Sequence, residues 1–107
     1  LANGLLTGKY RRNRPMPEGA RLTVTARLAE RTLTERNWEM VERLAGFCEG
    51  RDCTLLDLAF GWLLRRPAVA SVIAGATTPD QVAANVRAAE FVPTAEDMDE
   101  IDRLTAN

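Results

Sequence analysis

Apolar residues recur every three or four positions in four stretches of the chain, which is the spacing of amphipathic helices. We expect helices from Thr34 to about Gly50, from Thr54 to Arg66, from Pro79 to about Glu90 and from Ala95 to about Leu104, with a shorter one over residues 26–33. Each of the four long stretches follows a threonine that can serve as its N-cap: Thr34, Thr54, Thr78 and Thr94. The pattern therefore predicts a mainly helical chain.

Only one stretch, Val69 to Ala74, has the short apolar run expected of a β-strand. A single strand would leave the backbone groups on both of its edges unpaired. The N-terminal third is irregular: Leu1 to Tyr10 is a loop containing Gly4 and Gly8, and Arg11 to Arg31 is a basic loop broken by two prolines and a glycine. The pattern thus predicts that the single strand pairs with strands outside the sequence, and we interpret the chain as a piece of a longer protein.

The apolar faces of these helices predict one hydrophobic core. We expect it to contain Trp38, Val41, Leu44, Leu58, Trp62, Leu63, Val82, Val86, Ile101 and Leu104. The aromatic residues Trp38, Phe47, Phe60 and Trp62 belong to the same faces, so we interpret them as core and not as a cofactor site.

The overall composition is that of a globular domain, with 46% hydrophobic and 27% charged residues and a net charge of −1. This charge gives no broad electrostatic reason to expect nucleic acid or an anionic membrane as a partner. No apolar run approaches the roughly 20 residues that span a bilayer. The two cysteines, Cys48 and Cys53, have no metal-type spacing, and the absence of histidine argues against a zinc site. We therefore expect reduced, structural thiols in a cytoplasmic protein.

The stretch with the clearest chemistry is the turn that precedes the third long helix. Thr78 suits the N-cap, Pro79 the first helical position and Gln81 the third, which together form a capping box. The positive end of such a helix favours an anion, Gly75 would let it approach the backbone, and Thr77 offers a hydroxyl. The turn therefore predicts a phosphate site, although a well-capped surface helix after a buried strand would have the same pattern.

Two glycine-bearing stretches, L-A-N-G-L-L-T-G-K-Y and V-I-A-G-A-T-T-P-D-Q-V-A-A-N, together resemble the aldo-keto reductase family. The first is similar to the segment after the seventh barrel strand, the second to the eighth strand and the helix after it, and the tail F-V-P-T-A-E-D-M-D-E-I-D to the closing helix. The resemblance implies an α/β fold, the C-terminal portion of a (β/α)8 TIM barrel, in which the chain alone is mainly helical with at most one short strand. It divides the single unit 1–107 into a cofactor loop region (1–33), a helical pair (34–66) and the last strand with its two helices (69–107).

The family binds NADP(H) and reduces carbonyls to alcohols, and its motifs can be carried over residue by residue. The resemblance implies that Leu1, Ala2, Gly4 and Lys9 lie along the pyrophosphate, that Arg21, Gly75, Thr77 and Gln81 surround the 2′-phosphate, and that Asn85 reaches the adenine. Ala84 departs from the family pattern, where glutamate is common. The family's catalytic tyrosine, lysine, aspartate and histidine lie on earlier strands, so no catalytic residue and no metal ligand is assigned here.

We therefore predict the NADP-binding C-terminal portion of an aldo-keto reductase, inactive by itself, whose exposed faces favour self-association. The substrate would be a carbonyl or an alcohol in the full-length protein, and neither nucleic acid nor membrane is expected as a partner. The alternative is a free-standing helical module that binds a partner or a second copy of itself without catalysis.

Overall fold

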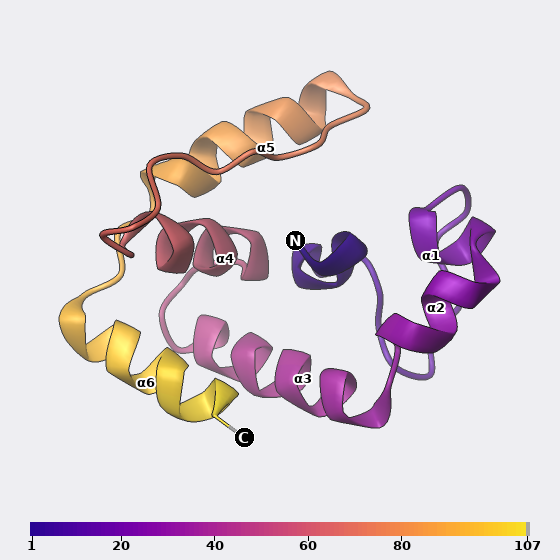
Figure 1. Ribbon diagram of the computed structural model, residues 1–107, viewed down its shortest axis with the longest axis horizontal. Coiled ribbons are helices and arrows are strands. Elements are labelled where there is room, and N and C mark those ends of the chain that lie inside the picture. Colours follow the sequence, from indigo (N-terminus) through magenta and orange to yellow (C-terminus); the bar gives the residue numbers. More distant parts are fainter. Residues whose placement is uncertain (107) are drawn as a thin grey trace.

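The computed structural model describes residues 1–106, and within them helices are the only regular secondary structure. The elements follow in the order η1 (Ala2–Thr7), α1 (Arg21–Val24), α2 (Ala26–Thr32), α3 (Glu35–Glu49), α4 (Leu55–Leu64), α5 (Pro79–Glu90) and α6 (Ala95–Thr105). Helix α4 lies at the centre, with α3 and α6 on one side of it and α5 on the other (Figure 1). The prediction of a mainly helical chain is confirmed.

The four long helices begin where their threonine caps predict. The Thr34 hydroxyl accepts from the Asn37 backbone N–H at 3.2 Å. At the starts of α4 and α6 the cap is reciprocal, because Asp57 and Asp97 in turn accept from the backbone N–H of Thr54 and Thr94, each at 3.0 Å. Each cap satisfies backbone donors that would otherwise lack a partner at the helix start, and so fixes the boundary locally.

The core lies between η1, α3, α4 and α6. Its buried residues are Leu5, Tyr10, Leu22, Val41, Leu44, Phe47, Cys48, Leu55, Leu58 and Ile101. Of the residues predicted for it, Val41, Leu44, Leu58 and Ile101 are buried, and Trp38, Trp62 and Leu104 pack against them. Phe47 and Phe60 are buried as well, so the interpretation of the aromatic residues as core is confirmed for these two.

The inward face predicted for α5 is wrong. Val82 and Val86 are 53% and 59% exposed, whereas Ala88 is fully buried. The helix packs closely on α4, because a Cβ placed on Gly61 of α4 would lie only 3.1 Å from the Phe91 carbonyl oxygen just after α5. So close an approach favours a small residue such as Ala88 at the contact. Val82 and Val86 are left largely exposed by the rest of the described chain.

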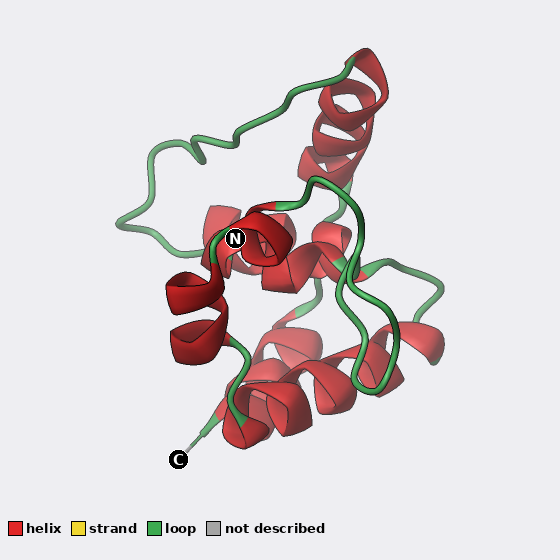
Figure 2. Ribbon diagram, turned by 90° about the vertical axis from the view of Figure 1, so that its right-hand side faces the viewer, coloured by secondary structure: helices red, strands yellow, loops and turns green. Residues whose placement is uncertain are grey.

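The strand predicted at residues 69–74 is also absent from the described residues. The connection from α4 to α5 is an irregular segment that arcs away from the helices (Figure 2), and Ile73 within it is fully exposed. A strand is defined by backbone hydrogen bonds to a neighbouring strand. No second strand exists among residues 1–106, so an apolar run with strand character finds nothing to pair with.

The N-terminal third is more ordered than its glycines and prolines predicted. Residues expected as a loop form η1, a 3₁₀ helix with a kink at Asn3 and Gly4, and Arg21–Val24 forms a single helical turn. The Tyr10 side chain, only 1% exposed, joins the two regions, because its hydroxyl accepts from the Leu22 backbone N–H at 3.0 Å. This contact gives the basic segment a fixed anchor in the core.

Candidate functional site

The turn before α5 forms a small hydrogen-bond network. The Thr78 hydroxyl caps the helix by accepting from the Gln81 backbone N–H at 3.2 Å. The predicted capping box is incomplete, because the Gln81 side chain turns to Thr77 instead of Thr78. Its Oε1 accepts from the Thr77 backbone N–H at 2.7 Å and from the Thr77 hydroxyl at 3.1 Å. Gln81 therefore fixes the position of Thr77 and keeps its amide Nε2 for another acceptor.

The same turn includes Gly75 and Asn85. The Asn85 side-chain amide donates to the Gly75 carbonyl oxygen at 3.5 Å, across ten residues of sequence. A Cβ placed on Gly75 would find no atom within 4 Å, so the backbone there is open to approach. Gly75, Thr77, Gln81 and Asn85 are thus brought together at the N-terminal end of α5.

The predicted N-terminal residues form a second group around the kink of η1. The Gly4 N–H donates to the Leu1 carbonyl at 3.0 Å, and Gly4 has a φ of +93°, which only glycine adopts readily. A Cβ placed on Gly4 would lie 3.3 Å from Cε2 of Tyr10 and 3.6 Å from Nζ of Lys9. The Lys9 side chain therefore lies over Gly4, at a position where only a glycine leaves room for Tyr10 as well.

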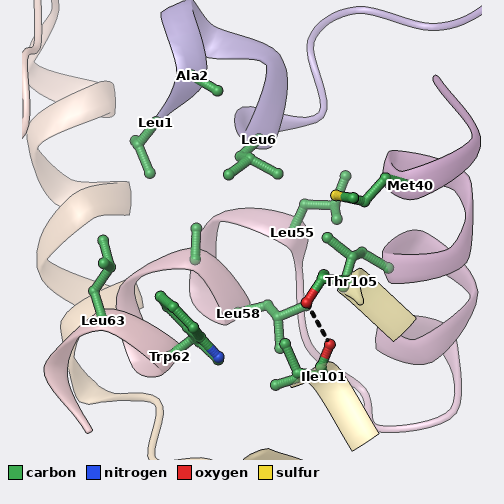
Figure 3. A pocket seen from close by; sticks show the side chains of 12 residues that line it. Leu1, Ala2, Leu6, Met40, Leu55, Leu58, Trp62, Leu63, Ile101 and Thr105 are labelled. Atoms are coloured by element: carbon green, nitrogen blue, oxygen red, sulfur yellow. Dashed lines mark hydrogen bonds between the residues drawn. The ribbon is translucent and has the colours of Figure 1, made fainter. Parts of the chain in front are cut away.

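Leu1 and Ala2, two of the predicted N-terminal site residues, line an apolar cavity of about 310 Å³. Leu1, Ala2 and Leu6 of the η1 region face Leu58 and Trp62 of α4 across it, with α3 and α6 closing the sides (Figure 3). Trp62 is held in place from outside, because its indole N–H donates to Asp102 at 2.9 Å and the Arg66 guanidinium lies 4.1 Å from its ring centroid. This cavity has the chemistry of a packing surface and holds no charged side chain.

Arg21 lies apart from both groups. It is exposed at the first position of α1, and among the described residues it forms no ion pair and no side-chain hydrogen bond. The structure therefore does not join Arg21 to Thr77 or to Gln81. The nine predicted site residues fall into two clusters and one separate arginine.

A polar cavity of about 500 Å³ lies where parts of both motifs meet. It is lined by Thr7, Thr54, Leu56, Asp57, Ala84, Arg87, Glu90 and Phe91. Thr7 belongs to the first glycine-bearing stretch and was not predicted as a site residue, whereas Ala84 belongs to the second and was named only as a departure from the family's glutamate. The helical period could have indicated that Ala84 lies near the site, because it follows Gln81 by three positions and shares its side of α5.

Ion pairs join several charged side chains at the surface of the described chain, among them Arg51 with Asp97 and Arg66 with Asp102. Among the described carboxylates, Asp97 is the clearest case: the hydrogen bond from Arg51 at 2.7 Å and the capping bonds from Thr94 hold its pKa below the usual value. No cluster of three or more metal-ligating side chains occurs within residues 1–106. Over the same residues, no helix is both long and apolar enough to cross a membrane.

Comparison with known proteins identifies the family. The model of the aldo/keto reductase family matches residues 1–106. A putative voltage-gated potassium channel subunit beta from Schizosaccharomyces pombe is 36% identical over 110 residues, covering 97% of this chain and 31% of its own length. Probable voltage-gated potassium channel beta subunits from Oryza sativa subsp. japonica and Arabidopsis thaliana are each 35% identical, with 33% and 29% of their lengths covered. The chain thus spans about a third of these relatives, and it belongs to the aldo/keto reductase family.

Proposed function

We propose that this chain is the NADP-binding C-terminal portion of an aldo/keto reductase barrel, from the end of the seventh strand to the closing helix. The reaction of the whole enzyme would be the reduction of a carbonyl to an alcohol. NADPH supplies the hydride in that chemistry, and the residues described here would bind and orient the cofactor.

The observation that carries this proposal is the network at the start of α5. Thr77 donates two hydrogen bonds to Oε1 of Gln81, so the free amide Nε2 of Gln81 has a set position beside the open backbone at Gly75. Donors that are ordered before the ligand arrives bind a phosphate at a lower cost in entropy. The positive end of the helix dipole adds to the attraction.

The exposed apolar surface supports the barrel part of the proposal. Ile73 is fully exposed in the segment that had the pattern of a strand, and Val82 and Val86 are exposed on α5. Single apolar residues at the surface of a monomer are normal, whereas here large ones follow one another on two consecutive segments. In a barrel, residues 69–74 would pair with neighbouring strands as the eighth strand, and the apolar cavity beside Leu1 and Ala2 would face the barrel wall.

The adenosine end of the cofactor would lie along α5. Asn85 projects from the same end of the helix as Gln81, and its neighbour Ala84 lines the polar cavity that also contains Arg87. Arg21 would reach the 2′-phosphate from its exposed position on α1. The pyrophosphate would follow the η1 turn, where Lys9 lies over Gly4.

Catalysis would depend on residues outside this chain. Tyr10 is its single tyrosine, and the hydroxyl is buried and occupied by the Leu22 N–H. It therefore holds the fold together and is not a proton donor to substrate. We propose that the chain by itself catalyses no reaction, and that the whole enzyme works in the cytoplasm. The relatives are named for association with a channel, and the proposal does not need such a partner.

The test is a titration of the 107-residue chain with NADPH, followed by the fluorescence of Trp38 and Trp62. Saturable binding that Gln81→Ala weakens about tenfold or more supports the proposed site, because a hydrogen bond to a charged group contributes about 1.5–3 kcal/mol. Arg21→Ala should weaken NADPH but leave NADH unchanged, since only NADPH carries the 2′-phosphate. Arg27→Ala, an exposed arginine on α2, is the matched control. Absence of binding by a chain that circular dichroism shows to be helical would overturn cofactor binding by this chain.

A second candidate function is a self-associating helical module. It is favoured by the same exposed residues, Ile73, Val82 and Val86, if a second copy covers them in place of barrel strands. Light scattering would then give a dimer mass, and Ile73→Lys together with Val86→Lys would return the chain to a monomer. A monomeric wild-type chain at tens of micromolar would exclude this function.

A further inference from the structure

Cys48 and Cys53 lie on either side of the turn that ends α3. Cys48 is in the last turn of the helix and is only 4% exposed, while Cys53 is half-buried directly before the Thr54 cap of α4. The Cys53 backbone N–H donates to the Cys48 carbonyl at 3.3 Å, and Asp52 between them has a left-handed φ of +57°. The 6→1 backbone bond and the left-handed residue before Cys53 are features of a Schellman-type helix ending, in which the first and sixth residues frequently contact each other.

This turn brings Cys48 and Cys53 close together, and each thiol affects the pKa of the other. Burial raises the pKa of both thiols. The interaction between them raises the pKa of Cys48 further, to about 12, and lowers that of Cys53. Asp57 of α4 raises both pKa values, Asp97 of α6 raises that of Cys53, and Arg51 lowers that of Cys53. Cys53 is also the more exposed of the two thiols, so it is the one that ionises first and that a peroxide reaches.

We propose that Cys48 and Cys53 are an oxidative modification site, at which hydrogen peroxide converts the pair into a disulfide with Cys53 as the attacking residue and Cys48 as the resolving one. This function is separate from cofactor binding and does not rest on it.

The chemistry balances in two steps. The Cys53 thiolate attacks one oxygen of the peroxide, the O–O bond breaks, and the departing hydroxide takes up a proton to form water, which leaves Cys53 as a sulfenic acid. The Cys48 sulfur then attacks the Cys53 sulfur, an S–S bond forms, and the hydroxyl group leaves with the Cys48 proton as a second water. Two thiols lose two electrons in total, and one peroxide accepts them.

The disulfide would act on a junction between three helices. Arg51, within the turn, donates from Nε to Asp97 of α6 at 2.7 Å, and its guanidinium lies 4.0 Å from the Phe47 ring centroid. Closing the ring of residues 48–53 restricts the unfolded chain and holds this turn in the conformation that Arg51 needs. The oxidised chain should therefore melt at a higher temperature than the reduced chain, by several degrees.

The experiment treats the full chain with hydrogen peroxide under native conditions, alkylates the remaining thiols with iodoacetamide and records the intact mass. The wild type should lose about 2 Da and both alkylation sites, reversibly with dithiothreitol. Its oxidation rate should rise about tenfold from about pH 7 to pH 8, since the thiolate fraction of Cys53 rises in that proportion below its pKa.

Two single variants identify the roles. Cys48→Ser should stop at a Cys53 sulfenic acid that dimedone traps, whereas Cys53→Ser should leave Cys48 reduced. The wild-type mass decides the outcome even if a variant fails to fold. Two alkylatable thiols after peroxide treatment, or equal peroxide reactivity of the two folded variants, would overturn the proposal.

Discussion

The contact between α4 and α5 depends on the absence of one side chain, and replacing it tests how α5 is positioned. Gly61 is buried in α4, opposite Phe91 and Pro93. A Cβ at this position would lie 2.7 Å from Cδ1 of Phe91, 3.0 Å from Cδ of Pro93 and 3.1 Å from the Phe91 carbonyl oxygen. Since carbon atoms normally pack at about 3.5–4.0 Å, Gly61→Ala requires the neighbours to move.

Two effects of this substitution have opposite signs. Alanine is favoured over glycine inside a helix by about 1 kcal/mol. Overpacking a well-filled contact costs about 1–3 kcal/mol. The phenyl ring of Phe91 could rotate away, but its backbone oxygen and the proline ring move only with the chain itself, so the clash should exceed the helical gain. We expect Gly61→Ala to lower the free energy of unfolding by about 1 kcal/mol and the melting temperature by about 4–8 °C.

The matched control is Gly46→Ala in the last turns of α3, where an added Cβ meets no atom within 4 Å. This variant gains helix propensity without a clash, so it should be more stable than the wild type by up to about 1 kcal/mol. Urea unfolding followed by circular dichroism at 222 nm measures both. If Gly61→Ala stabilises the chain as much as Gly46→Ala does, the close approach of α5 to α4 is wrong, and with it the placement of the turn at Thr77.

Three further changes test other contacts. Tyr10→Phe leaves the buried Leu22 N–H without its acceptor and should cost about 1–3 kcal/mol in urea unfolding, whereas an unchanged midpoint would mean that water replaces the hydroxyl. Asp97 has a folded pKa below its ordinary value through its bond to Arg51, so its stabilisation is complete above about pH 4 and is lost as pH falls through the folded value. The unfolding free energy should therefore fall less steeply below about pH 4 in Asp97→Asn than in the wild type, and parallel profiles would contradict this assignment. Thr54→Ala should cost about 1 kcal/mol and Thr54→Ser much less, because serine keeps the capping hydroxyl; equal losses would show that the methyl group matters instead.

The helices were predictable because their boundaries are set by residues close in sequence. Thr54 and Asp57 bond to each other's backbone within one turn, so the start of α4 needs no tertiary contact. The same holds for Thr94 and Asp97 at α6. The helical period then determined which residues of α3 and α4 face the core, as at Val41 and Leu58.

Predictions that depended on distant partners were wrong. Residues 69–74 have the composition of a strand, but strand structure needs a second chain segment to complete its hydrogen bonds, and none is present among residues 1–106. Val82 and Val86 were assigned inward because they are apolar, yet the side of α5 that contacts α4 is decided by the space beside Gly61 and Phe91. Apolar character alone does not say which surface covers a residue.

The same distinction between local and distant contacts applies to the candidate site. Sequence placed Thr77, Gln81 and Asn85 at one helix end, and they do meet there, although Gln81 bonds to Thr77 in place of the expected Thr78. Arg21 lies on α1, and only the tertiary arrangement decides whether its side chain contacts Thr77 or Gln81. In this structure it contacts neither. A phosphate held by Thr77 and Gln81 would supply the charge that draws Arg21 in, so the two halves of the proposed site would be joined by the ligand itself. The Arg21→Ala variant is therefore the sharper of the two binding tests, because Gln81 has a contact to lose before NADPH arrives and Arg21 has none.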